Sequence, residues 1–190
     1  MKRWMVAAAV ALSAASLSSC TLVATNSSPV RITSLIPFGI LSKTIPGTNG
    51  AKVLFKTQPV YFVDATNNLT PSSRIVPRPP ALSTIIKQLL LGPTAIERSA
   101  GYSSDLPKSL VLLSASVHGQ IGYVNFATPL STMPREKQIL AVGQLVLSAY
   151  EVGAIQGIVI RVAGVNQQLW TPEGTRTTFA TPRSFARLLD

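Results

Sequence analysis

Residues 110–126 read LVLLSASVHGQIGYVNF, two apolar-rich runs separated by His118 and Gly119. Glycine accepts a positive φ without steric cost, so the sequence predicts a β-hairpin with a two-residue turn at this dipeptide. Such a turn pairs Val117 with Gln120, Ala115 with Gly122, Leu113 with Val124, and Val111 with Phe126. One face is then mixed and the other apolar, formed by Val111, Leu113, Val117, Val124 and Phe126. An isolated hairpin is marginal in water, so flanking segments must cover the apolar face.

Apolar residues at helical spacing predict one helix on each side of the hairpin. Residues 80–91 carry a stripe that ends before Gly92-Pro93 and consists of Leu82, Ile85, Ile86 and Leu89. Residues 134–152 carry a longer stripe of Ile139, Val142, Val146, Ala149 and Tyr150. Gly143 lies within this second stripe, and glycine costs about 1 kcal/mol relative to alanine in a helix. We therefore expect a close approach of the helix to the sheet at Gly143.

Further strands are predicted before and after this core. Residues 53–64 indicate a strand entered through Pro59, and after a loop Ile75 and Val76 add a short one. The β-branched run 156–163 predicts a strand that Gly164 closes. Loops or short elements are expected at 94–108, 170–174, 175–181 and 185–189. The predicted class is α+β, with a small antiparallel or mixed sheet of about four or five strands and two helices packed on one face.

The charge is strongly positive. The chain has 17 Lys and Arg, 7 Asp and Glu, and a formal net charge of +10; without Lys2 and Arg3 the balance is 15 against 7, or +8. An anionic partner would be attracted by this charge. However, the basic residues form no block and do not alternate with aromatic residues as in a nucleic-acid groove. We therefore favour a solubilising positive surface and expect no nucleic-acid partner.

The first nineteen residues have the pattern of an export signal. Lys2 and Arg3 precede an apolar run at residues 4–16. This run is shorter than the ~20 residues that a membrane-spanning helix needs, but it fits the apolar part of a signal peptide.

The sequence Leu17-Ser18-Ser19-Cys20 resembles the lipobox of bacterial lipoproteins. The resemblance implies cleavage between Ser19 and Cys20, with a diacylglyceryl group and an N-acyl group on Cys20. Cys20 is the only cysteine of the chain, so neither an intrachain disulfide nor a cysteine metal cluster can form. The alternative is an ordinary leader in which this cysteine is incidental.

The expected organisation follows from these signals. Residues 1–19 are a lipoprotein signal peptide, residues 20–51 carry the lipidated cysteine and a flexible tether, and residues 52–190 form the folded domain. The Ser-, Thr-, Asn-, Gly- and Pro-rich pieces of the tether disfavour regular structure. Its apolar part, residues 31–45, could pack on the domain or contact a partner or the membrane.

Few residues suggest chemistry. His118, the only histidine, is predicted at an exposed turn, where it suits neither a Ser-His-Asp site nor a zinc site. Among the seven acids, Asp64 and Glu151 are the one pair to examine for glycoside cleavage. Trp170 and Tyr150 could form a ligand shelf, although Trp170 is expected to pack a turn onto the domain. Phosphate-binding and metalloprotease motifs are absent, and we expect no enzyme, metal or cofactor.

Several short motifs follow one another within residues 59–164: VYFVD, LLLGPT, DLP, YVNF, QLV and GIVIRVAG. Their order resembles that of the GerMN domain of bacterial sporulation and spore-germination proteins, which also occurs in actinobacterial lipoproteins of the LpqB type. His118-Gly119 stands where the family commonly has Asp-Gly, and the chain has room for one copy of the domain. The resemblance implies an extracytoplasmic α+β domain of envelope assemblies, without agreed catalytic residues.

These observations favour a lipoprotein anchored at the outer face of the cell membrane. Its expected function is that of a non-enzymatic scaffold in a sporulation- or wall-related assembly, with an envelope protein as partner. Open sheet edges or the mixed hairpin face would make the contact. The first alternative is a module that binds anionic wall polymer or a small ligand, which would gather the basic side chains on one face. The second is a wall hydrolase, which would need two acids in one cleft.

Overall fold

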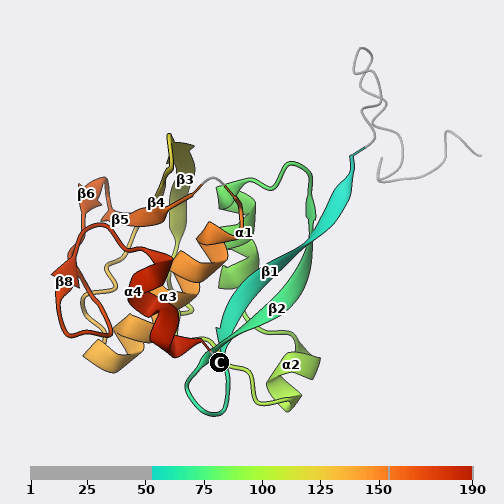
Figure 1. The fold of residues 1–190 in the computed structure, drawn as a ribbon, viewed down its shortest axis with the longest axis horizontal. Coiled ribbons are helices and arrows are strands. Elements are labelled where there is room, and N and C mark those ends of the chain that lie inside the picture. The colour runs from blue at the N-terminus through green and yellow to red at the C-terminus, as the bar shows by residue number, and fades with distance from the viewer. Residues whose placement is uncertain (1–52, 154, 190) are drawn as a thin grey trace, which may run out of the picture. The chain divides into compact units, whose positions relative to one another are not determined.

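A computed structural model describes residues 53–153 and 155–189; the predicted leader, Cys20, the tether and the apolar stretch 31–45 lie outside this part. Its central element is a mixed sheet of strand order β3-β4-β5-β6 (Figure 1). The strands are β3 (Leu112–His118), β4 (Ile121–Phe126), β5 (Gly157–Val162) and β6 (Val165–Asn166). β3 and β4 form the predicted hairpin, and β4 is parallel to β5. This arrangement confirms the α+β class.

The predicted pairing of the hairpin is wrong. Val117 lies opposite Gly122, because Gly119, with φ +59°, occupies the first turn position and Gln120 the second. Glycine first is the pattern of a type II′ turn, whereas the prediction placed it second. The shift moves each partner by two residues and so leaves Val117, Val124 and Phe126 on their predicted face.

A bulge changes the other end of β3. The register shifts between Leu112 and Ser114, so Leu113 is an extra residue that reverses the alternation of side chains. Leu112 therefore packs against the core, while Val111 and Leu113 are 54% and 53% exposed. Their predicted place on the apolar face is wrong.

Two helices cover the sheet as predicted. Helix α1 (Leu82–Leu90) contacts β3, and α3 (Arg135–Tyr150) contacts β5. All four stripe residues of α1 are buried in the same core as Val124, Phe126, Ile158 and Ile160. Within the described residues, neither these nor the shorter helices are long and apolar enough to cross a membrane.

The predicted loop after residue 64 is mostly a strand. β1 (Phe55–Val63) pairs in antiparallel register with β2 (Leu69–Pro77) along nine residue pairs. The connecting turn is short because the Asp64 carboxylate accepts hydrogen bonds from the N–H groups of Thr66 and Asn68. Pro71 does not prevent pairing, since a strand of a two-stranded sheet has an edge where a missing N–H is tolerated.

Helix α3 lies between the mixed sheet and the β1–β2 hairpin (Figure 1) and is buried on more sides than its predicted stripe. Its polar residues make the extra contacts. Ser148 Oγ accepts a hydrogen bond of 2.9 Å from the Tyr61 N–H, and Gln144 Nε2 donates one of 3.1 Å to the Tyr61 carbonyl. Tyr150, predicted to be part of the stripe, is 53% exposed at the helix end.

The C-terminal segment closes the other side of α3. The short pair β7 (Leu169–Trp170) and β8 (Arg176–Thr177) is followed by α4 (Pro182–Phe185) and a 3₁₀ turn, η1 (Ala186–Leu188). A Cβ on Gly143 would lie 2.6 Å from Leu69 Cδ1 and 3.1 Å from Phe185 Cδ1. The close approach predicted at Gly143 thus exists, but its partners are β2 and α4 rather than the central sheet.

A short helix was missed in the predicted loop 94–108. Residues Ala95–Ser99 form α2, whose first turn is closed by a capping box between Thr94 and Glu97. This Thr-x-x-Glu spacing is the signal that would have predicted it.

Candidate functional site

The outer edge of β3 is open. In the described part of the chain no further strand pairs with it. His118 and Ile121 close the turn, so alternate residues of β3 bond to β4 while Ala115 and Val117 direct their backbone N–H and C=O groups outward. These groups form a template on which another strand can pair.

The side chains along this edge do little to prevent such pairing. Natural edge strands are usually protected by charged residues, proline or bulges. The sequence of β3, LLSASVH, contains no Lys, Arg, Asp, Glu or Pro, and its bulge at Leu113 is the one such feature. Val111, Leu113 and Val117 are 54%, 53% and 39% exposed beside it.

The sheet face that points away from α1 and α3 carries a row of polar and aromatic side chains. Tyr123 lies edge-on to His118, with ring centroids 5.6 Å apart, and the Arg161 guanidinium lies 4.3 Å from the Tyr123 ring. His118 is exposed, as predicted, and its Nε2 is 3.2 Å from Ser116 Oγ. This face and the open edge of β3 together form the hairpin surface.

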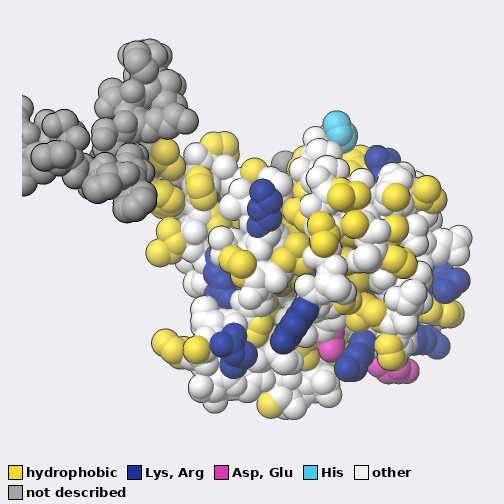
Figure 2. All heavy atoms as spheres, turned by 180° about the vertical axis from the view of Figure 1, so that it is seen from behind, with side chains coloured by type: hydrophobic (Ala, Val, Ile, Leu, Met, Phe, Trp, Pro, Cys, Tyr) yellow, Lys and Arg dark blue, Asp and Glu magenta, His cyan; other side chains and the backbone are white. Residues whose placement is uncertain are grey.

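The basic side chains are distributed over the domain. Arg74 pairs with Glu97, Arg98 donates to the Pro93 carbonyl, and Arg135 and Arg176 lie 4.5 Å and 4.7 Å from the Trp170 ring. On the face drawn in Figure 2, the Lys and Arg side chains are spread among apolar and uncharged surface, and acidic side chains lie beside some of them. The single basic face that the polymer-binding alternative requires is not seen there.

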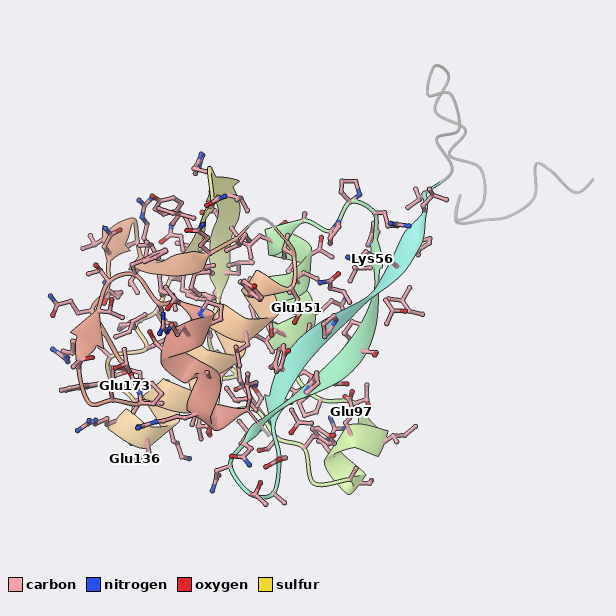
Figure 3. The ribbon with its side chains drawn as sticks, viewed as in Figure 1. Lys56, Glu97, Glu136, Glu151 and Glu173 are labelled. Carbon is pink, nitrogen blue, oxygen red and sulfur yellow. The ribbon has the colours of Figure 1, made fainter. Side chains whose placement is uncertain are left out.

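Asp64 and Glu151, the pair of acids considered for glycoside cleavage, have different partners. Asp64 closes the β1–β2 turn, where the Thr66 hydroxyl and neighbouring backbone N–H groups lower its pKa to about 2. Glu151, at the C-terminal end of α3 (Figure 3), accepts a hydrogen bond of 3.1 Å from the Tyr61 hydroxyl. Burial, followed by the charge of Glu151, raises the pKa of Tyr61 to about 12. The structure does not bring Asp64 and Glu151 together in one site.

The predicted aromatic shelf is also divided. Trp170 is half-buried against Arg135 and Arg176. The backbone N–H of Trp170 donates a hydrogen bond of 3.1 Å to Gln138 Oε1. Tyr150 lines a separate hollow of about 380 Å³. No group of three or more metal-ligating side chains occurs among the described residues.

One hollow of the domain was not predicted. It measures about 690 Å³ and is lined by Asn67, Asp105, Glu136, Lys137, Ile139, Leu140, Pro172, Arg187 and Leu188. These residues come from the β1–β2 turn, the loop before β3, the start of α3, the β7–β8 turn and η1. The sequence contains no signal for this hollow, because only the tertiary fold brings these segments together.

The fold and its hairpin surface define a small α+β domain with an open sheet edge. Residues 59–168, more than half of the chain, match the family model described as "Germane: Sporulation and spore germination". The chain therefore belongs to this family. No curated protein matches it.

Solved structures support the same fold. The tandem GerMN domains of the sporulation protein GerM from Bacillus subtilis match with a TM-score of 0.53 and 14% identity, covering 74% of this chain and 49% of that one. The first GerMN domain of the same protein matches with a TM-score of 0.52 and 15% identity, covering 67% of this chain and 98% of that one. The chain thus spans about half of the tandem structure and resembles a single GerMN domain.

Proposed function

We propose that the protein is a lipid-anchored extracytoplasmic lipoprotein whose domain acts as a non-enzymatic interaction module in the cell envelope. The apolar leader and the sequence Leu17-Ser18-Ser19-Cys20 support the anchor. Membership of a sporulation and spore-germination family supports a place in an envelope assembly.

The observation that carries the interaction role is the open, uncharged edge of β3. A strand of an envelope partner would bond to the outward backbone groups of Ala115 and Val117, and its side chains would contact Leu113 and Val117. This mode of recognition is β-augmentation, in which backbone hydrogen bonds give affinity and side-chain contacts give specificity.

The edge is tested by adding charge to it. The variant L113K/V117K introduces two lysines at exposed positions of β3, as natural proteins do to prevent edge pairing. The control I75K/I96K makes the same change at Ile75 and Ile96, which are 74% and 83% exposed outside β3. Tagged full-length proteins are cross-linked in cells and purified from solubilised membranes, and the proteins recovered with them are quantified.

We expect one dominant envelope protein with the unmodified chain and with I75K/I96K, and at least a fivefold loss of it with L113K/V117K. Equal recovery with L113K/V117K would contradict the edge as the contact. No enriched protein with the unmodified chain, in cells where it is abundant, would contradict the scaffold role.

The anchor is tested separately. Replacing Cys20 with Ala should abolish fatty-acid labelling and release the protein from the membrane fraction, because two acyl chains are enough for stable anchoring and the variant can carry none. If the Cys20→Ala variant keeps both the label and the membrane fraction, the lipoprotein assignment is wrong.

A further inference from the structure

The 690 Å³ hollow has the size of a small-molecule site, for which about 300–1,000 Å³ is usual. It opens where the β1–β2 turn, α3 and the C-terminal segment meet. Figure 1 shows the C-terminal end of the described chain beside that turn, and Figure 3 shows Glu136 at the start of α3. The hollow is separate from β3, which contributes none of its lining.

The floor of the hollow is apolar. Ile139 and Leu140 come from α3, Leu188 comes from η1, and Pro172 comes from the β7–β8 turn. Pro172 is buried, and the other three are half-buried. An apolar group of a ligand would therefore gain by leaving water on this floor.

The rim carries charges of both signs. Lys137 and Arg187 are exposed cations, and Asp105 and Glu136 are carboxylates. The one ion pair within 4.0 Å in the described part of the chain joins Arg74 to Glu97, so none of these four is neutralised at contact distance. A ligand that carries both a negative and a positive group would pair with the cations and the carboxylates of the rim.

Asp105 differs from the other rim residues because its carboxylate is partly buried. Its backbone N–H donates to Gln144 Oε1 at 3.0 Å, which fixes the residue, but no donor among the described residues reaches its carboxylate. Burial raises the pKa of Asp105, and the positive charge of Lys137 opposes this effect. A hydrogen-bond donor or an ammonium group in the hollow would relieve the desolvation of this carboxylate.

We propose that this hollow binds a short peptide that has a free α-carboxylate and an apolar side chain. The carboxylate would bind to Lys137 and Arg187, the peptide N–H groups or its ammonium group to Asp105, and the apolar side chain to Leu140 and Leu188. A purely anionic ligand would meet the two rim carboxylates, and a purely apolar ligand would remove water from four charges without pairing them. A peptide end matches the cations, the carboxylates and the floor together.

The probe is the tripeptide Ala-Leu-Ala with free ends, titrated into the purified full-length protein in detergent micelles and followed by calorimetry. Its C-terminal amide lacks the carboxylate and should bind at least tenfold more weakly. The Lys137→Gln variant should weaken the free peptide about tenfold but change the affinity of the amide less than twofold. Lys108→Gln makes the same change at a different hollow and should bind the free peptide like the unmodified protein.

Asp105→Asn provides a second, independent arm. It should weaken the free peptide more than the N-acetylated peptide, because the latter has no ammonium group. Both substituted side chains lie at the rim rather than in the core, and thermal unfolding of each variant shows whether it is folded. Absence of binding at millimolar peptide would overturn the proposal. The proposal would also be overturned if neither Lys137→Gln nor amidation of the peptide weakened binding, or if L113K/V117K abolished binding.

Discussion

The Glu97 carboxylate joins α2 to β2 through an ion pair and hydrogen bonds, and its replacement by Gln gives a quantitative test of the fold. The Arg74 guanidinium binds the Glu97 carboxylate through two hydrogen bonds of 2.7 Å and 2.8 Å. The same carboxylate accepts hydrogen bonds from the Ser72 hydroxyl and from the Thr94 N–H, the latter at 2.6 Å. The two charged side chains are 12% and 16% exposed, so the ion pair is largely but not completely removed from water.

The expected cost can be estimated from these contacts. Removing one partner of a buried ion pair costs roughly 3–5 kcal/mol, and a hydrogen bond to a charged group contributes about 1.5–3 kcal/mol. Gln can still complete the capping box, so that contribution remains. Because both side chains retain some exposure, we expect Glu97→Gln to lower the free energy of unfolding by about 2 kcal/mol. Glu97→Ala also removes the cap and should cost about 1 kcal/mol more.

Urea unfolding followed by circular dichroism measures these differences. The control is Glu173→Gln, the same change at an exposed acid, which should alter stability by less than about 0.5 kcal/mol. The Arg74 guanidinium holds the pKa of Glu97 well below its usual range, so this stabilisation is complete above the unfolded pKa of about 4.3 and is lost as the pH falls below it. The gap between the unmodified protein and Glu97→Gln should therefore shrink in acid. A gap below about 0.5 kcal/mol at pH 7, or one that does not depend on pH, would contradict a stabilising Arg74–Glu97 ion pair.

Three further predictions concern the core and the rim. Gly157→Ala places a Cβ 2.6 Å from the Ala180 carbonyl oxygen and should destabilise the domain by about 1–3 kcal/mol in urea; an unchanged midpoint would contradict this close contact. Phe185→Ala removes a fully buried side chain and should lower the free energy of unfolding by about 3–5 kcal/mol. Amide hydrogen exchange should rise first in α4 and η1, and unchanged protection there would count against the packing of α4 on α3. Burial raises the pKa of Asp105, so the native state binds more protons than the unfolded state, and the free energy of unfolding should rise as the pH falls from 7 toward that pKa. The Asp105→Asn variant should lack this rise. Equal pH dependence of the two proteins would be inconsistent with a desolvated carboxylate at Asp105.

Elements with a regular spacing or a continuous run of apolar residues were predictable from the sequence. The four stripe residues of α1 were predicted to form one apolar face and are buried, and the β-branched run 156–163 was predicted to be a strand and forms β5. The hairpin itself was predicted, but its register depends on which turn position Gly119 occupies. The bulge at Leu113 was not predictable, because no sequence pattern marks it. The length of β2 was missed because Pro71 and its serines have low strand propensity, while pairing with β1 supplies the hydrogen bonds.

The surfaces were less predictable than the fold. An open edge was expected, and its position follows from the strand order, which brings β5 next to β4 and leaves β3 outside. The hollow joins residues as far apart in the chain as Asn67 and Leu188, and each of them alone resembles an ordinary surface residue. The acids Asp64 and Glu151 were chosen for their places at element ends, but a shared site depends on side-chain contacts that a one-dimensional pattern does not contain.

The most direct test of the central claim places a photo-cross-linking amino acid at Val117 in the full-length protein, in the cells that naturally produce it. The same residue at Ile96, which is 83% exposed on α2, is the control. We expect a discrete cross-linked product with a partner protein from Val117 and none from Ile96. The same product from Ile96, or none from Val117 while the protein is abundant in the membrane, would contradict the assignment of the β3 edge as the contact surface.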